Sequence, residues 1–281
     1  IVYLSISGVG ETGPYVGKRV YDPVVQALSG LADIQADPIT GRPRMVRTLV
    51  ADKTTALYAA QAVTAALFHR AMTGEGQHVR LSMLDTMVSF LWPEGMSNYT
   101  VKADGDKTPV TSQHDMIFDT ADGYITVGTV ADGEWRNLCH ALKKPQWLND
   151  PRFATPALRS KNREDRLRLV GDVLIGGKRD DWIECLEAAD VPCAPVLRRR
   201  EVLDNAQVVA NKMVETFNHG ASGEVRQARP AARFSGATPR IHGPAPALGE
   251  HTTDILHELE FDSHSIEQLL ARGVVLATKK D

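Results

Sequence analysis

The sequence lacks the features that mark several common classes of protein. It contains only three cysteines, an odd number, and none stands at metal-ligand spacing from another cysteine or a histidine. A disulfide framework is therefore excluded, and a reducing cytoplasm is the expected location. No apolar run is long enough to cross a membrane, and no signal peptide is recognisable. We expect neither a bound metal ion nor a membrane partner.

The sequence also has little excess of charge. The formal net charge is −3, with 24% charged and 43% hydrophobic residues among 281. This balance gives no electrostatic support for nucleic-acid binding and is ordinary for a globular protein with a real core. The chain opens on IVYLSIS, a strand-like run with no partner upstream and no initiator methionine. We therefore expect that an earlier part of this domain is missing from the sequence.

The stretch from Val50 to Met83 carries the strongest pattern in the chain. Apolar residues recur there at helical spacing and predict a helix over 53–72, ended by Gly74. Asp52 stands at the front of this helix. It has two interpretations, an ordinary N-cap or a reactive carboxylate held where the first N–H groups favour negative charge. Position alone favours the cap.

Gly8 to Gly13 form a G-x-G-x-x-G pattern after the first strand, which is typical of a dinucleotide site. Such a site needs a helix that opens at the glycines and holds the pyrophosphate. Here Pro14 and Gly17 follow without an apolar helical period, so we expect no NAD binding. The simpler interpretation is a glycine-rich turn whose backbone approaches a neighbour closely.

Other local signals predict an alternation of helices and strands. Asp22 before Pro23 predicts an N-cap and a short helix to Leu28, and Ser82 with Asp85 resembles a capping box. Downstream, the pattern predicts a hairpin over 116–120 and 124–130, helices over 134–142, 162–174, 179–189, 253–259 and 266–271, and strands over 214–218 and 224–228. The predicted organisation is a large domain (1–92), a linker (93–110), a small domain (111–207), and a linker with a return to the large domain (208–281).

Several blocks in a fixed order resemble the class III CoA-transferase family, which also includes 2-methylacyl-CoA racemases and carnitine-type CoA-transferases. They are ISGVGETGPY, VAD before the long helix, TGEGQHVRLSMLD, TADGYITV, DPRFAT, EAADVPCAPV and LGEHT. Each block alone is weak evidence for the family. Together the blocks cover nearly the whole chain, and their correct order is strong evidence. The resemblance implies an α/β fold with a Rossmann-like large domain built from both chain ends. It also implies an inserted smaller α/β domain and an interlocked homodimer.

The resemblance also implies a set of site residues. Asp52 matches the catalytic aspartate of the family, and this match overturns the preference for a cap. Arg19 and Tyr21 match positions that touch CoA near its reactive end, and Met83 matches one on the adenine side. For Met83, filling space in the core is an equally weighted interpretation. CoA and acyl-CoA enter as substrates, with a small carboxylic acid as the second partner and no permanently bound cofactor.

A carboxylate suits this chemistry because it attacks a thioester to give a mixed anhydride, and CoA thiolate then converts the anhydride to an aspartyl-CoA thioester. Nearby backbone N–H groups are candidates for stabilising the oxyanions. The first alternative is a 2-methylacyl-CoA racemase or epimerase, and the second is a catalytically silent CoA-binding homologue. Racemases of the family carry histidine where this chain has Tyr21. Tyrosine is a poor general base near pH 7, so transfer is favoured.

Overall fold

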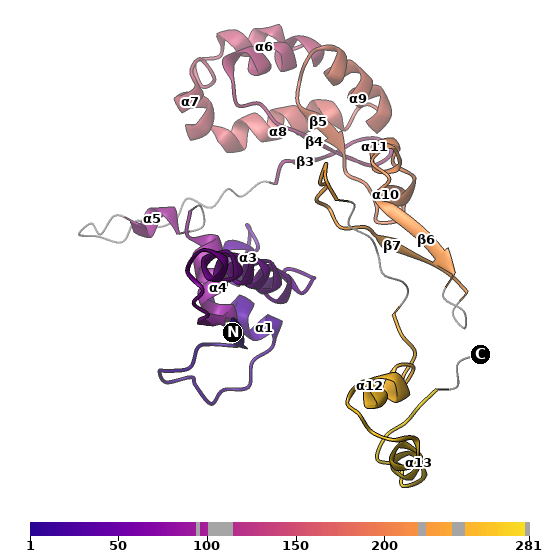
Figure 1. The fold of residues 1–281 in the computed structure, drawn as a ribbon. Helices are drawn as coiled ribbons and strands as arrows, with labels where there is room; N and C mark the ends of the chain where they lie inside the picture. The colour runs from indigo at the N-terminus through magenta and orange to yellow at the C-terminus, as the bar shows by residue number, and fades with distance from the viewer. Residues whose placement is uncertain (94–95, 101–114, 219–222, 238–244, 279–281) are drawn as a thin grey trace. The chain divides into compact units, whose positions relative to one another are not determined.

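A computed structural model describes the chain except for residues 94–95, 101–114, 219–222, 238–244 and 279–281 (Figure 1). The described residues form a mixed α/β structure that divides into two compact units, Ile1–Pro195 and Val196–Asp281. Most of the predicted linker at 93–110 lies outside the described residues. The predicted domain limits therefore stay a prediction.

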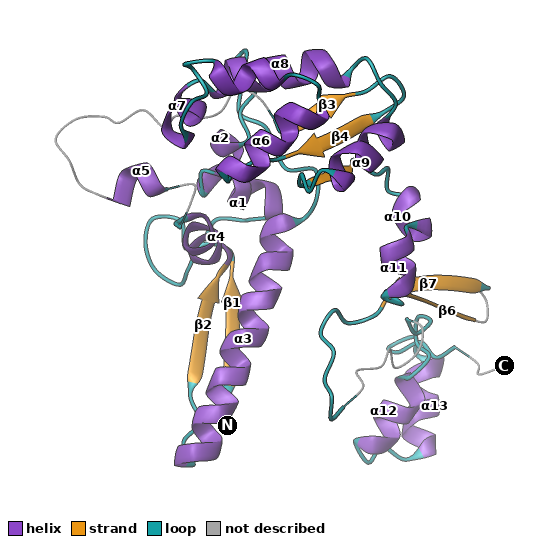
Figure 2. Ribbon diagram, turned by 90° about the horizontal axis from the view of Figure 1, so that it is seen from above, coloured by secondary structure: helices purple, strands orange, loops and turns teal. Residues whose placement is uncertain are grey.

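The first unit begins with two parallel strands. Strand β1 (Tyr3–Ser7) pairs with β2 (His78–Ser82) along their whole length. The chain between them forms α1 (Asp22–Leu28), α2 (Leu31–Ile34) and α3 (Val50–Thr73), and α3 runs along the sheet (Figure 2). A tight turn cannot join parallel strands, because the chain has to return to the end from which it started. The long crossover supplies that return.

Local sequence signals set the ends of α3 and of the next helix. Gly74 ends α3 with a φ of 80°, a conformation that glycine adopts without strain, as predicted. The helix starts at Val50, three residues before the predicted start. The Ser82 hydroxyl caps α4 (Met83–Leu91) by accepting from the Asp85 N–H at 3.0 Å. The short helix α5 (Ser97–Thr100) follows.

A small apolar cluster joins these helices. Its buried members are Val25 of α1, Leu31 of α2, Ala51 of α3, and Met87 and Leu91 of α4. Ala51 is fully buried although it lies in the first turn of α3. The packing therefore holds that turn close to α1 and α4.

The rest of the first unit has a three-stranded antiparallel sheet with helices around it. The predicted hairpin is present as β3 (Ile117–Asp119) and β4 (Tyr124–Val127), and β5 (Cys193–Pro195), which the sequence did not predict, pairs with β4. The helices are α6 (Asp132–Ala141), a 3₁₀ helix (Pro145–Asn149), α7 (Pro156–Lys161), α8 (Arg163–Leu174) and α9 (Arg179–Ala188). The sequence predicted α6, α8 and α9 to within two residues at each end.

The core of this part is built on stacked aromatic rings. Trp135 lies 6.2 Å from Trp147 in a stacked pair and 5.6 Å from Phe153 in an edge-to-face pair, measured between ring centroids. Arg159 is 4% exposed and pairs with Asp132, and its guanidinium donates to the Phe153 carbonyl at 3.1 Å. The core of this part is therefore well packed, and its buried arginine has hydrogen-bond partners.

The second unit consists of short elements. Helices α10 (Glu201–Asp204) and α11 (Ala206–Ala210) precede the hairpin of β6 (Val214–Asn218) and β7 (Glu224–Ala228), whose bounds agree with the prediction. Helices α12 (Thr252–Glu258) and α13 (Ser263–Ala271) complete the unit. The Asp262 carboxylate caps α13 by accepting from the Ser265 N–H at 2.7 Å.

Candidate functional site at the start of helix α3

A buried carboxylate occupies the start of α3. Asp22 is 2% exposed, and its Oδ2 accepts from the Ala51 N–H at 2.7 Å and from the Asp52 N–H at 3.1 Å. A buried carboxylate is costly unless hydrogen bonds satisfy it, and these two N–H groups belong to the free donors of a helix terminus. Asp22 therefore caps α3 from a position 29 residues before Ala51.

This arrangement corrects the predicted Asp22 cap and excludes the alternative in which Asp52 is a cap. Asp22 does not cap its own helix: Tyr21 stands at the N-cap of α1 without a side-chain hydrogen bond, and Asp22 is the first helical residue. Asp52 is not an N-cap either, because it is the third residue of α3 and Leu49 stands at the cap position. Cap signals in a sequence are local, whereas this cap joins two separate helices.

Gln26 extends the contact to the segment that leads into α3. Its side-chain amide donates to Asp22 Oδ1 at 2.5 Å, and its Oε1 accepts from the Val46 N–H at 2.9 Å. The same amide nitrogen lies 3.3 Å from the carbonyl oxygens of Val46 and Thr48. Gln26 is 2% exposed, so water does not compete for these bonds. One buried pair thus holds both the entry segment and the first turn.

The first turn of α3 has its N–H groups already occupied. The Val50 N–H donates to the Thr48 carbonyl at 2.8 Å, and the Lys53 N–H donates to the Leu49 carbonyl at 3.2 Å. The N–H groups of Ala51 and Asp52 donate to Asp22. The N–H groups of Val50, Ala51 and Asp52 are among those that a helix terminus would otherwise offer to an anion, whereas the Lys53 bond is the first regular bond of the helix. These three N–H groups are therefore not available to an Asp52 carboxylate or to an oxyanion.

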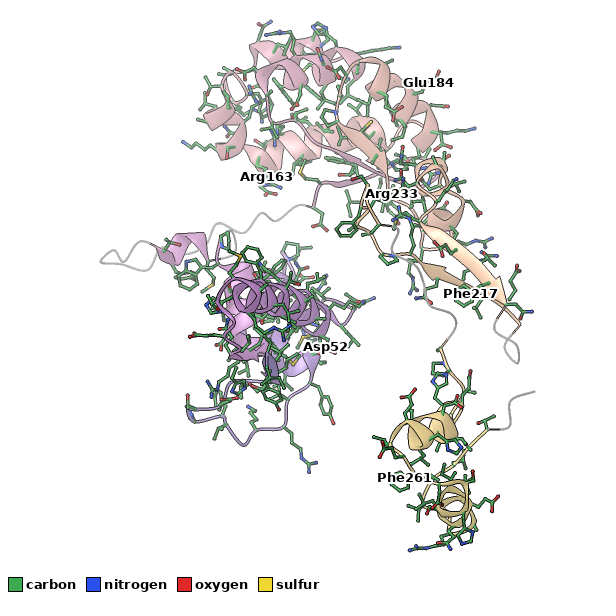
Figure 3. All side chains as sticks on the ribbon, viewed as in Figure 1. Asp52, Arg163, Glu184, Phe217, Arg233 and Phe261 are labelled. Atoms are coloured by element: carbon green, nitrogen blue, oxygen red, sulfur yellow. The ribbon has the colours of Figure 1, made fainter. Side chains whose placement is uncertain are left out.

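The Asp52 side chain itself is exposed and lies beside α1 (Figure 3). Within the described part of the chain it makes no side-chain hydrogen bond or ion pair. Tyr21 is 76% exposed and adjoins Asp22, so the fold brings it close to Asp52. Arg19, two residues earlier, is also exposed. The fold thus places Asp52 and the backbone of Tyr21 near one helix start, whereas no contact of Arg19 with that turn is observed among the described residues.

Met83, the fourth predicted residue, is the first residue of α4. Its side chain is half-buried and packs against the cluster that contains Ala51. The interpretation as a core-filling residue therefore has direct support. A contact with the adenine side of CoA stays a prediction.

The glycine-rich segment forms turns and bends, and no helix opens between Gly8 and Val20. A side chain on Gly8 would place its Cβ 2.7 Å from Val20 Cβ, so only glycine permits this close approach. This confirms the predicted glycine-rich turn that approaches a neighbour closely. The helix required to hold a pyrophosphate is not present at these glycines.

A hollow lies at the carboxyl ends of β1 and β2, beside this turn. It has a volume of about 370 Å³ and is lined by Ser7, Val9, Gly10, Glu11, Thr12, Arg80, Leu81, Ser82 and Asp85. Arg80 and Glu11 form an ion pair across its edge at 2.8 Å, with both side chains largely exposed. In parallel α/β sheets, ligands bind beyond the carboxyl ends of the strands. No pattern in the sequence indicated this hollow.

Two further features bear on function. In the part of the chain that the structure describes, no three His, Cys, Asp or Glu side chains are grouped so that they would hold a metal ion. Among the same residues, no helix combines the length and apolarity that a membrane span requires.

Comparison with solved structures places the fold among known α/β proteins. A CAIB/BAIF family protein from Brucella suis matches with a TM-score of 0.74 and 30% identity, over 92% of this chain and 68% of that one. Residues 1–252 match the family model described as CoA-transferase family III. The chain belongs to this family. The resemblance inferred from the sequence blocks is thereby confirmed.

Relatives of assigned function carry related names. Succinyl-CoA:glutarate CoA-transferase of Mus musculus is 31% identical over 280 residues, which cover 98% of this chain and 64% of that protein. Formyl-CoA:oxalate CoA-transferase of Escherichia coli is 27% identical over 291 positions, covering 95% of this chain and 70% of that protein. The chain thus spans less than two thirds of the length of the mouse relative.

Proposed function

We propose that the complete protein is a CoA-transferase that moves CoA from an acyl-CoA donor to a free carboxylic acid. The observation that carries this proposal is the state of Asp52. Its carboxylate is exposed at a fixed turn and is not used as a cap, because Asp22 already fills that role. Family membership over residues 1–252 supports the same assignment.

The proposed reaction has two symmetrical halves. A carboxylate oxygen of Asp52 attacks the thioester carbon of the donor, and the C–S bond breaks. CoA leaves as a thiolate, and Asp52 and the donor acyl group are joined as a mixed anhydride. The thiolate then attacks the Asp52 carbonyl carbon, the donor acid leaves as a carboxylate, and Asp52 carries CoA as a thioester. The acceptor carboxylate repeats these two steps in reverse order and restores the Asp52 carboxylate. No net proton is taken up or released.

The donors for the tetrahedral oxyanions come from outside the first turn of α3 in this proposal, because the N–H groups of Val50, Ala51 and Asp52 already have acceptors. Arg19 and Tyr21 contact the CoA moiety near its reactive end, and Met83 contacts its adenine side. Arg19 and Tyr21 are exposed and available for such contacts. CoA is a substrate here, and no permanently bound cofactor is required.

The names of the relatives guide the choice of substrates. Succinate and glutarate appear in the name of the mouse relative, and formate and oxalate in that of the bacterial one. We therefore propose a short carboxylic acid as acceptor. Dicarboxylates of four and five carbons are the first acceptors to test. The sequence has no glycine-rich run in the proposed small domain that would favour the formyl/oxalyl pair.

The proposed assembly is an interlocked homodimer in the cytoplasm, with a Rossmann-like large domain formed by both chain ends. Helix α3 supports this proposal through its exposed apolar side chains. Leu57 is 72% exposed, Phe68 69% and Met72 71%, which is unusual for three large residues on one helix. Covering such side chains with another surface removes apolar area from water, which favours association.

Isotope exchange tests the proposed activity. Full-length protein is incubated with succinyl-CoA or another acyl-CoA and a panel of ¹⁴C-labelled free acids, and label in the acyl-CoA pool is measured. We expect exchange, together with hydroxylamine-sensitive modification of Asp52. Loss of α-deuterium from a 2-methylacyl-CoA without exchange would favour the racemase alternative. Binding of CoA without either reaction would favour the silent homologue.

A further inference from the structure

Asp22 stands out because nothing in the proposed chemistry uses it, although it is a buried carboxylate next to the proposed nucleophile. Its hydrogen-bond partners in the described chain are the N–H groups of Ala51 and Asp52 and the amide of Gln26. No lysine or arginine pairs with it among the described residues. Its negative charge is therefore held by peptide and amide dipoles alone, which is a demanding arrangement for a group that is 2% exposed.

The contact reaches the backbone of the nucleophile itself. The N–H group that donates to Asp22 at 3.1 Å is that of Asp52, one bond from the Cα that carries the reactive side chain. Gln26 braces the other carboxylate oxygen at 2.5 Å and ties it to the entry segment at Val46. A short side chain on a backbone held in this way has few orientations left, and covalent catalysis depends on such placement.

The contact also removes an electrostatic effect that would make Asp52 a poorer nucleophile. A free helix start stabilises a carboxylate in its ground state through its N–H groups and its dipole. Asp22 takes two of those N–H groups and places its own negative charge there, while the Thr48 carbonyl accepts from the N–H group of Val50. These three N–H groups are therefore not available to hold the Asp52 carboxylate.

We propose that Asp22 is a positioning residue for the transfer reaction: it caps α3 from outside the helix, fixes the backbone of Asp52 and leaves the Asp52 carboxylate free to attack. This inference rests on the proposed function. It goes beyond it by giving a role to a residue that does not touch the substrate.

A purely structural cap is the competing explanation, and two kinetic constants separate it from positioning. Loss of a cap alone lowers stability, whereas loss of positioning lowers kcat and leaves KM for acyl-CoA nearly unchanged. We expect Asp22→Ala to lower kcat by about 10²-fold, the effect of a misplacement of about 1 Å, with KM changed less than about threefold. Asp262→Ala is the matched control, because it removes an aspartate cap from α13 without touching α3. It should keep kcat within about twofold of wild type while losing stability.

Asp22→Asn is the second variant, and it tests the positioning role if Asp22→Ala does not fold. Asparagine caps as well as aspartate, but its amide nitrogen would face the Gln26 amide nitrogen, and both are donors. We expect the helix to form and kcat to fall by about fivefold with KM unchanged, since the brace is lost and the cap is kept. A folded Asp22→Ala or Asp22→Asn protein with wild-type kcat would overturn the proposal. So would an equal loss of kcat in Asp262→Ala.

Amide hydrogen exchange keeps the test independent of the activity. If the wild type transfers no CoA with any donor and acid, the proposed function fails, and exchange at Ala51 and Asp52 still tests the contact with Asp22 on which the positioning role depends. We expect both amides to be protected in the wild type and to exchange at least about tenfold faster in Asp22→Ala or, if only that variant folds, in Asp22→Asn. Unchanged exchange in the folded variant would overturn the positioning role.

Discussion

Residues 1–93 and residues 115–195 differ in how they bury their apolar side chains. The second region closes around a core of fourteen buried residues that includes two tryptophans. The first has a core of only five buried residues, and it leaves Leu57, Phe68 and Met72 largely exposed along α3. The proposed nucleophile and its buried support lie in the less covered region. The comparison suggests that the second region owes its stability to its own core, whereas the first depends on further surfaces.

The first prediction is that Asp52→Asn abolishes CoA transfer and leaves the fold of residues 1–93 intact. Asp52→Asn removes the attacking carboxylate, and because Asp22 and not Asp52 caps α3, the helix should be unaffected. We expect transfer to fall by about 10³-fold or more, with CoA binding retained. Steady-state kinetics and calorimetry measure both. Near-normal turnover by a folded variant, with deamidation excluded by mass spectrometry, would contradict the nucleophile assignment.

The second prediction concerns the uncovered side chains of the first region. We expect the full-length protein to be an obligate homodimer with an interface well beyond about 2,000 Å². Phe68→Asp should yield monomer or aggregate, because a buried unpaired charge is not tolerated at such an interface. Light scattering at micromolar concentration measures this. A monodisperse wild-type monomer would remove the basis for the proposed assembly.

The third prediction concerns the stability of the aromatic core in residues 115–195. Trp135 is 3% exposed and stacks on Trp147 and Phe153, so Trp135→Ala should lower the free energy of unfolding by about 3–5 kcal/mol. Trp135→Phe is the control and should cost less, because a phenyl ring stays in the stack and the indole N–H that is lost has no partner among the described residues. Urea denaturation measures both. Equal losses in the two variants would show that the stacked rings do not carry the stability.

The fourth prediction tests the ligand of the first region. Arg19→Ala should weaken acyl-CoA binding by about 1.5–3 kcal/mol, the range for a hydrogen bond to a charged group. Arg42→Ala changes another exposed arginine in the same region and should leave the affinity unchanged. Calorimetry with CoA measures both variants. NAD should show no binding, and micromolar NAD affinity would count against the assignment.

The smallest expected effect is a pH dependence in the second region. N–H groups of Ala131 and Val130 donate to the Glu134 carboxylate and lower the pKa of Glu134 below its ordinary value of 4.5. A carboxyl with a lower pKa in the folded state stabilises the fold above the unfolded value, and this contribution is lost as the pH falls through the folded pKa. Wild type and Glu134→Gln should therefore differ in melting temperature at pH 6, and the difference should shrink as the pH falls through the lowered pKa of Glu134. Glu184→Gln, at an exposed position of α9, is the control (Figure 3).

The sequence by itself determined much of the secondary structure, because the signals for it act over a few residues. The apolar period of α3 and Gly74 at its end predicted that helix, and alternation predicted the strands Val214–Asn218 and Glu224–Ala228 to the residue. The order of short sequence blocks determined the family. The domain limits and the roles of Arg19 and Tyr21 in binding CoA remain predictions.

Only the tertiary structure decided which carboxylate caps α3. Both Asp22 and Asp52 carry the local signature of a cap, and both local interpretations were wrong. The helices α1 and α3 are packed through Val25 and Ala51, and this packing carries the Asp22 carboxylate to N–H groups 29 and 30 residues away. A hydrogen bond over that separation depends on which helices meet, and no short sequence pattern encodes that meeting. Because this packing makes Asp22 the cap of α3, the Asp52 carboxylate is not used as a cap.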